Sequence, residues 1–532
     1  MKEPRLTDQP DDAANPEEEL LDEGDGRRFL FFQVMPSWLT SFLVHIILII
    51  VLAIAAWRIP GKTLVSLESG EATTDVTAFE NLDFNMDESS EMLEQNSEVE
   101  NTNEEELIET VEYTEIEEEY EEEMPSLMEP TENFGMVEEE ASAPIGAMPG
   151  GSGQISGRSQ SERMKHVRQN GGNAASENAV KLALDWLAEH QLANGSWNFD
   201  HRLAPGTILS PNPGDFNEAP NAATSMALLC FLGAGQTHIE GDYKEVVENG
   251  LAFLLNNGVR TRNGLTFEED QGGLYNHGLA AIALCETYAM TDDIRFAQPA
   301  QEALRYIEWS QDPIGGGWRY EPKQAGDTSA VGWQIMALKS AHMCGLEVDS
   351  AVIRMARRFL NFVSSESGTF YGYTHPVEER RKGVTSVGLL SQMYLGWTKD
   401  NPALTAGVKW IGERGPHVGD WKPDMMSLSE AEKPRFRCGM YYNYYATQLM
   451  RQYGGEKWDK WNLEMRDFLI ATQATEGAAK GSWFFQDPDE GGYIHGGRLY
   501  ATTLACMTLE VYYRYLPLYD DEKTSEAEFE LD

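Results

Sequence analysis

The chain has 532 residues, which is enough for one large domain with appendages or for two to three domains of average size. Its formal net charge of −46 argues against nucleic-acid binding, because phosphate contacts need a surface of lysine and arginine. The five cysteines exclude a disulfide-stapled scaffold, and no Cys-x-x-C pair suggests zinc or redox chemistry.

Residues 39–57 carry no formal charge. At about 1.5 Å per residue, a helix of this length spans a hydrocarbon core of about 30 Å. Trp38 and Trp57 lie at its two ends, where aromatic side chains favour the membrane interface. A cleaved signal peptide is the alternative, but the polar tail of residues 1–38 is too long for an ordinary leader. The sequence therefore predicts one uncleaved transmembrane helix.

The basic residues around this span nearly balance. Arg27 and Arg28 precede it, while Arg58 and Lys62 follow it. Because the positive-inside rule depends on such residues, it decides the orientation only weakly. We expect a single-pass protein with its short N-terminal tail inside and its large domain on the extracytoplasmic side.

Residues 63–157 contain 28 acidic residues and no lysine or arginine. High net charge with few large apolar residues is typical of disorder, and the Gly/Ser/Pro/Ala-rich residues 144–157 are typical of a flexible linker. We therefore predict a disordered acidic linker over residues 58–164. It is interpreted as a self-repelling spacer, with a binding arm for a basic protein partner as the alternative. Residues 518–532 form a second acidic tail.

Six repeats of about 50–60 residues fill the predicted domain, residues 165–517. Each has an amphipathic segment, a turn with glycine and an aromatic residue, and a second segment that is apolar on most faces. Apolar residues at three- and four-residue spacing predict helices, and a helix that is apolar all round is buried. The second segments begin near Asn221, Tyr275, Asp327, Val384, Tyr441 and Tyr500.

Twelve such helices predict an all-α domain of the (α/α)6 toroid type, with six outer and six inner helices. An open solenoid is the alternative, but its last unit should be a polar cap. The last inner segment, from Ala501, is as apolar as the others. This favours a closed ring in which the last hairpin packs on the first.

Three of the turns follow one pattern: Gln191 with Gly195-Ser196-Trp197, Gln311 with Gly316-Gly317-Trp318, and Gln473 with Gly481-Ser482-Trp483. This pattern resembles the Gln–Trp repeat of squalene and oxidosqualene cyclases, whose helical hairpins also occur in protein prenyltransferase β-subunits. The resemblance covers about residues 175–517 and implies the toroid fold. Because the repeat is structural, it says little about chemistry.

The cyclase resemblance implies a proton-donating Asp-x-Asp-Asp stretch at the start of an inner helix. The most similar string here is Gln324-Ala325-Gly326-Asp327-Thr328-Ser329, in which Gly326 stands where the proton donor is expected. Asp327 is therefore either an acid or an N-cap, and we favour an N-cap, which would lower its pKa. The prenyltransferase zinc ligands would include an Asp-x-Cys pair, but Ser329 stands in place of the cysteine. We expect neither a metal site nor a cofactor.

Other barrels of this shape carry polysaccharide lyases and glycosidases. A lyase needs a tyrosine or histidine base, and a glycosidase needs two opposed carboxylates. The densest candidate cluster is Glu268-Glu269-Asp270 before Tyr275-Asn276-His277, although solvated turns and helix caps would explain the same residues. Catalytic candidates are Asp327, His277 and Tyr275. Candidates for substrate binding are Trp333, Arg319, Tyr320, His375, Tyr442 and His495.

Two functions remain open at this stage. The first, which we favour, is a membrane-anchored toroid that binds an apolar or isoprenoid ligand or a protein partner without catalysis. The second is an enzyme, either a divergent terpenoid cyclase or a polysaccharide lyase. The absence of the cyclase acid motif and of the prenyltransferase ligand pair favours the first function.

Overall fold

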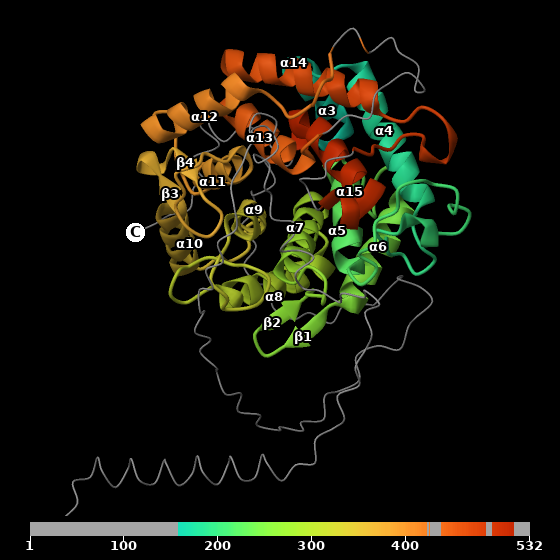
Figure 1. The fold of residues 1–532 in the computed structure, drawn as a ribbon. Coiled ribbons are helices and arrows are strands. Elements are labelled where there is room, and N and C mark those ends of the chain that lie inside the picture. The colour runs from blue at the N-terminus through green and yellow to red at the C-terminus, as the bar shows by residue number, and fades with distance from the viewer. Residues whose placement is uncertain (1–157, 423–424, 426–437, 486–491, 515–532) are drawn as a thin grey trace, which may run out of the picture. The chain divides into compact units, whose positions relative to one another are not determined.

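The computed structural model describes residues 158–422, 425, 438–485 and 492–514 (Figure 1). The predicted tail 1–38, membrane span 39–57 and tail 518–532 lie outside these residues, as does most of the predicted linker. Across the described ranges, no helix is both long and apolar enough to cross a membrane. Residues 160–164, which the sequence places in the linker, form the start of helix α3 (Gln160–Gln169).

The described residues form two layers of helices (Figure 1). The outer helices are α4 (Ala174–Glu189), α6 (Lys244–Asn257), α8 (Ile294–Ser310), α10 (Ser350–Val363), α12 (Pro402–Arg414) and α14 (Gly455–Thr472). The inner helices are α5 (Pro220–Gly233), α7 (Leu274–Thr291), α9 (Thr328–Met343), α11 (Lys382–Tyr394), α13 (Met440–Tyr453) and α15 (Gly492–Leu509). Five inner helices begin within two residues of their predicted starts, whereas α15 begins at Gly492, eight residues before the predicted start at Tyr500, and contains the non-helical residue Gly497.

Short elements connect or flank the hairpins. Two antiparallel strand pairs follow outer helices: β1 (Val259–Thr261) with β2 (Gly264–Thr266), and β3 (Ser364–Ser365) with β4 (Phe370–Tyr371). Short 3-10 turns lie in loops of the described residues: η4 (His201–Leu203), η5 (Glu366–Gly368) and η7 (Gly477–Ala479). The short helix α16 (Val511–Arg514) follows α15 and packs against α3.

The burial of each layer follows from its sequence. In α10, the buried residues are spaced three or four apart along one face, and Asp349 caps the helix by accepting a hydrogen bond of 2.7 Å from the amide of Ala351. In α9, by contrast, fifteen of the sixteen residues are buried. An inner helix therefore depends on neighbours on all sides.

The inner helices form a closed ring (Figure 1). Each packs against the next along the chain, from α5 to α15, and α15 packs against α5. The predicted all-α toroid is therefore confirmed for this domain, and the open solenoid is not formed. Closure places the last hairpin beside the first, so both ends of the repeat array are covered.

The three Gly–Trp turns share one hydrogen-bonding geometry. Trp197, Trp318 and Trp483 are fully buried. Each indole Nε1 donates to a backbone carbonyl of the preceding outer helix, at 2.7 Å to Leu187, 2.8 Å to Ile307 and 2.8 Å to Leu469. The large ring thus fills the corner of the hairpin while its single donor satisfies an acceptor near the helix end.

In three of the six repeats, a glutamine connects one hairpin to the next. The amide nitrogen of Gln473 donates to Gly481 O (2.9 Å) in its own turn and to Ala179 O (2.8 Å) in α4. Gln191 and Gln311 make the same pair of bonds to their own turns and to α6 and α10. In the last repeat, this bond joins the end of the array to its beginning.

The turn glycine makes the close approach possible. Gly481 has a φ of 88°, and a Cβ built there would lie 2.2 Å from Leu182 O in α4. Gly316 has a φ of 84° and stands equally close to Met355 O in α10. Both the backbone conformation and the packing therefore require glycine.

Replacing Gln473 by alanine tests the joint between the last and first hairpins. The change removes two buried hydrogen bonds, so we expect the free energy of unfolding to fall by about 2–4 kcal/mol. Urea denaturation of the purified protein, followed by circular dichroism, measures the effect. Gln298→Ala, on the exposed face of α8, is the control and should change stability by less than about 0.5 kcal/mol. Equal effects of the two variants would contradict a structural role for Gln473.

Candidate functional site

The structure brings together two of the three predicted catalytic residues. The Tyr275 hydroxyl, in the first turn of α7, donates to Asp327 Oδ1 at 3.2 Å and lies 2.7 Å from Ser329 Oγ. Asp327 Oδ1 also accepts from Ser329 Oγ (2.8 Å) and from the amide of Ala330 (2.7 Å). The predicted N-cap is therefore confirmed, since this carboxylate satisfies an amide at the start of α9.

Two predicted binding residues complete this group. Arg319 Nε lies 3.8 Å from Asp327 Oδ2, an oxygen that makes no hydrogen bond to any described residue. The Arg319 guanidinium lies over the rings of Tyr320 (5.5 Å) and Tyr373 (5.8 Å), and the Tyr275 and Tyr320 rings are 5.6 Å apart. We call these residues, with Ser329, the Asp327 cluster.

The loop that carries the cluster is fixed by close backbone contacts. The amide of Asp327 donates to Trp318 O at 2.9 Å, which closes the loop between them. A Cβ at Gly326 would lie 2.6 Å from Gly317 Cα and 2.9 Å from the ring of Phe359. The position where the cyclase resemblance expects a proton donor therefore has no room for a side chain.

Burial controls the protonation of the cluster. It raises the pKa of Asp327 to about 6, even though the Ala330 amide, Ser329 and Arg319 all favour the ionised form. The pKa decrease expected from capping is thus wrong, because the loss of hydration outweighs the hydrogen bonds. Burial and the nearby Asp327 raise the pKa of Tyr275 well above its usual value, so this phenol stays protonated. Near neutral pH the carboxylate can accept a proton, but it is not the strong acid that alkene protonation needs.

His277 lies apart from this cluster, with both ring nitrogens bound to backbone. Nε2 is 3.0 Å from Ala303 O, and the amide of Phe267 donates to Nδ1 at 3.3 Å. Burial lowers its pKa to about 4, so the ring is neutral near pH 7. This environment gives no support to the predicted catalytic role, because neither nitrogen is available to a substrate.

Trp333 and Tyr442 both lie on inner helices, but their side chains have different surroundings. Trp333 is buried inside the ring, stacked on Tyr444 at 5.6 Å and edge-on to Tyr445 at 5.5 Å. These rings from α9 and α13 occupy the interior where we expected a ligand. Tyr442 points the other way, since its hydroxyl donates to Gly415 O (2.9 Å) and its ring packs on Trp461 of α14.

The two remaining histidines lie in connecting loops or at a helix start. His375 is exposed, and its Nδ1 lies 3.0 Å from Thr374 Oγ1. His495 Nδ1 lies 2.7 Å from Asp215 Oδ1, and its ring stacks on Phe216 at 4.6 Å. Neither residue joins the Asp327 cluster through an interaction seen in the described residues.

The predicted acidic cluster before α7 accepts hydrogen bonds from the neighbouring helices. Glu269 accepts hydrogen bonds from the amides of Asn221 (2.8 Å) and Ala222 at the start of α5. Glu268 accepts from the Tyr306 hydroxyl on α8. These contacts support the helix-cap explanation rather than a pair of glycosidase carboxylates. Within the described ranges, no group of three or more His, Cys, Asp or Glu side chains could hold a metal ion.

The sequence did not reveal two residues of the site, one that contacts Arg319 and one that contacts Asp327. Tyr373 follows β4 and places its ring beside Arg319, although nothing in its local sequence distinguishes it from other loop tyrosines. Ser329 was considered only as a missing cysteine, whereas its hydroxyl bonds both Asp327 and Tyr275. The sequence signal for Ser329 is its place in Asp327-Thr328-Ser329, where polar residues follow the N-cap.

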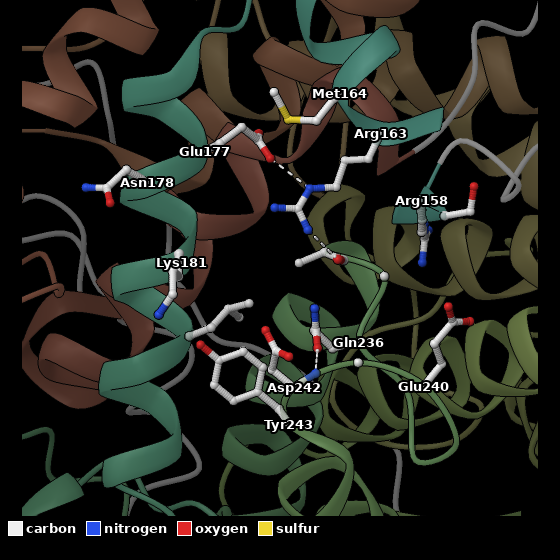
Figure 2. Close-up of a pocket in the computed structure, with 15 residues that line it drawn as sticks. Arg158, Arg163, Met164, Glu177, Asn178, Lys181, Gln236, Glu240, Asp242 and Tyr243 are labelled. Atoms are coloured by element: carbon white, nitrogen blue, oxygen red, sulfur yellow. Dashed lines mark hydrogen bonds and ion pairs between the residues drawn. The ribbon is translucent and has the colours of Figure 1, made fainter. Parts of the chain in front are cut away.

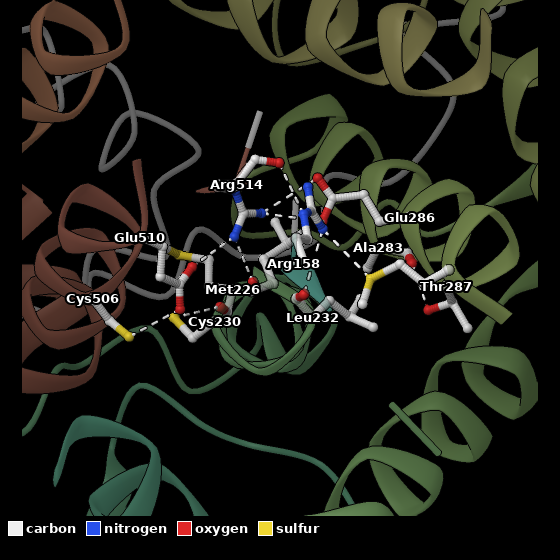
Figure 3. Close-up of polar contacts among 12 residues, drawn as sticks. Arg158, Met226, Cys230, Leu232, Ala283, Glu286, Thr287, Cys506, Glu510 and Arg514 are labelled. Carbon is white, nitrogen blue, oxygen red and sulfur yellow. Dashed lines mark hydrogen bonds and ion pairs between the residues drawn. The ribbon is translucent and has the colours of Figure 1, made fainter. Parts of the chain in front are cut away.

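A second group of polar residues is buried where the ring closes (Figure 3). Arg158 Nη1 lies 2.8 Å from Glu286 Oε2, and Arg514 Nη2 lies 3.2 Å from the same oxygen. Arg514 also pairs with Glu510 at 2.9 Å and donates to Leu229 O at 2.6 Å. Burial raises the pKa of Glu510 to about 8 despite the attraction of Arg514. We call Arg158, Glu286, Glu510 and Arg514 the closure cluster.

Outside the ring lies a surface pocket of about 460 Å³ (Figure 2). Arg163 and Met164 of α3, Asn178 and Lys181 of α4, and the loop between α5 and α6 line it. It is within the size range of small-molecule sites. None of the residues predicted as catalytic or substrate-binding lines this pocket.

No family model matches the chain, and no curated protein matches it. Distant structural matches include an α-1,6-mannanase from Salegentibacter sp. HEL1_6 (12% identity, 64% of this chain and 99% of that chain, TM-score 0.42). A GH76 α-mannanase from Bacteroides thetaiotaomicron covers 66% of this chain and 98% of its own at 12% identity and a TM-score of 0.45. Candida albicans protein geranylgeranyltransferase-I is 14% identical, and the match covers 62% of this chain and 94% of that chain with a TM-score of 0.37. These similarities concern the toroid fold and assign no substrate.

The closure cluster gives a prediction about stability. Glu286→Gln keeps the size of the side chain but leaves two buried guanidiniums without their shared carboxylate. Breaking a buried ion pair typically costs about 3–5 kcal/mol, and we expect a loss of that order in urea denaturation. Glu413→Gln, which breaks an exposed pair with Lys409, should have little effect. A Glu286→Gln variant as stable as the parent would show that the cluster does not hold the ring closed.

The raised pKa of Asp327 predicts a specific pH dependence. Its carboxyl titrates near 3.8 when unfolded and near 6 when folded, so the folded state binds more protons between these values. The stability that it contributes is fully present below about pH 4 and is lost as pH rises through about 6. A shift of about two units corresponds to about 3 kcal/mol.

Asp327→Asn isolates this term, because asparagine keeps an oxygen for the Ala330 amide but does not titrate. We expect the variant's stability relative to the parent to rise by about 3 kcal/mol between pH 4 and pH 8, measured by urea denaturation. Asp270→Asn, at an exposed position, should run parallel to the parent. Buried histidines such as His277 also make stability depend on pH. Because they do so equally in the variant and in the parent, their contribution cancels when the two are compared. A constant difference between Asp327→Asn and the parent would contradict the assignment.

Proposed function

We propose that this chain is a membrane-anchored toroid that binds a ligand or protein partner and catalyses no reaction. In this proposal residues 39–57 anchor the chain, the acidic linker acts as a spacer, and the toroid works on the extracytoplasmic side. An acidic segment is repelled by anionic lipid headgroups, which would hold the domain away from the bilayer. An apolar or isoprenoid ligand and a basic partner of the linker are the expected binding partners.

The observation that carries this proposal is the use of the candidate catalytic groups within the fold. Asp327 caps α9 and His277 bonds two backbone groups, so each has a structural task. The aromatic rings of Trp333, Tyr444 and Tyr445 occupy the ring interior. A cyclase would need that interior for its substrate, together with a strong acid at its entrance.

One observation favours a second candidate, a polysaccharide lyase. Tyr275, Arg319 and Asp327 converge as a phenol, a cation and a carboxylate with a raised pKa. A lyase uses such groups to remove a proton next to a carboxylate and to stabilise the enolate that forms. The buried position of Asp327 and the high pKa of Tyr275 weaken this candidate.

The two candidates differ in turnover. The full-length protein in detergent would be incubated with uronate-containing polysaccharides, and the ultraviolet absorbance of an unsaturated product would be followed. We expect no product from the parent, and no difference between the parent, Tyr275→Phe and Asp327→Asn. If the parent forms product and both variants fail to do so while keeping the circular dichroism spectrum of the parent, the lyase would replace the binding proposal.

Mass spectrometry of extracts from the same preparation tests the binding proposal. A co-purifying isoprenoid or lipid in stoichiometric amount would support an apolar ligand, and a stoichiometric protein would support a partner. Protease digestion of sealed membrane vesicles of known orientation tests the topology. A toroid digested only from the cytoplasmic face would contradict the extracytoplasmic placement.

A further inference from the structure

Two free cysteines meet where the first and last inner helices pack together (Figure 3). Cys230 lies in α5 and Cys506 lies in α15, and both side chains are fully buried. The two thiols hydrogen-bond each other, and Figure 3 draws them beside the Glu510 carboxylate. Cys506 Sγ lies 3.3 Å from Glu510 Oε1. A pair of thiols therefore lies at the joint that closes the ring.

Contacts on either side of this pair fix how the two helices are aligned. Cys230 Sγ lies 3.4 Å from Thr503 O, and Thr503 is about one helical turn before Cys506 in α15. About one turn after Cys230, a Cβ at Gly233 would overlap the Glu510 carboxylate, which directly follows α15. The helices thus approach each other closely before and after the pair. Two cysteines that face each other across such a contact need little backbone movement to form a disulfide.

The closed ring protects both thiols from reaction. Burial raises the pKa of Cys230 and of Cys506, and the thiolate is the form that reacts with a disulfide. Because both side chains are fully buried, an external disulfide cannot reach either sulfur while the helices are packed. Oxidation therefore requires that the joint between α5 and α15 is open, as it is before the last hairpin packs on the first.

We propose that Cys230 and Cys506 are a disulfide-forming pair that closes the ring covalently when the protein meets a small-molecule disulfide such as oxidised glutathione. While the joint is open, the thiolate of one cysteine attacks the glutathione disulfide, forms a mixed disulfide and releases one reduced glutathione. The thiolate of the second cysteine then displaces the other glutathione, and the S–S bond forms. The pair loses two protons and two electrons, and one oxidised glutathione becomes two reduced molecules.

Packing of α15 on α5 then buries the new bond. The bond joins the first inner helix to the last, so it spans most of the repeat array, and a cross-link over a long segment restricts the unfolded chain strongly. Glu510 contacts both Cys506 and Arg514, so the covalent closure lies next to the closure cluster. This inference goes beyond the proposed binding function and does not depend on it, although an extracytoplasmic domain would meet oxidising conditions.

Peptide mapping tests the linkage in the full-length protein in detergent. The protein is held with oxidised and reduced glutathione in urea just below the midpoint of unfolding, where the joint opens and recloses, and free thiols are then alkylated. Trypsin releases residues 203–244 with Cys230 and residues 499–514 with Cys506, and neither peptide has a second cysteine. We expect these two peptides in one linked species that separates on reduction. Absence of this species, whether the two thiols stay free, carry glutathione or pair elsewhere, would overturn the proposal.

Thermal unfolding tests whether the bond holds the ring closed. We expect the oxidised parent to melt at least about 5 °C above the same protein reduced with dithiothreitol in the same urea concentration. This difference should vanish in Cys506→Ser and persist in Cys438→Ser, which removes a buried cysteine outside the pair. Cys230→Ser provides the same test if Cys506→Ser does not fold. A linked protein that melts at the temperature of the reduced protein would overturn the role in ring closure.

Discussion

The structure depends on a contact that three of the six hairpins make with the outer helix of the next. A glutamine amide bridges its own turn to that helix, and a glycine with positive φ brings the turn close enough for the bridge. One hairpin cannot bury an inner helix that is apolar on every face. The contact therefore repeats until the turn at Gly481 meets α4, and every inner helix then has neighbours on both sides.

The same turns also determine which acidic side chains the candidate site can contain. The loop from Trp318 to Asp327 is drawn so close that Gly326 lies against Gly317, which leaves no space for a second acid. Asp327 remains, and the packing that buries it also gives it a helix to cap. Its raised pKa is thus a consequence of ring assembly, because burial removes hydration while the cap restores only part of it.

The sequence predicted the hairpins well because their signals are local and repeated. Apolar periodicity and the spacing from Gln311 to Trp318 depend on residues that are close in the chain. Helix α3 was missed because Gln160–Gln169 is mostly polar, and Arg158 stands at the end of a glycine-rich segment. The direction of the Asp327 pKa shift depends on burial among distant segments. Tyr373 likewise reaches Arg319 only through the fold, so local spacing could not reveal it.

The closure cluster also determines where the two ends of the domain are fixed. Arg158, the first described residue, donates to Arg514 O at 2.9 Å, and both side chains meet the same carboxylate of Glu286 on α7. A charge buried without its partner is costly, so Arg158 and Arg514 hold each other in place through Glu286. Two segments that lie 356 residues apart in the chain are therefore fixed to one carboxylate on α7.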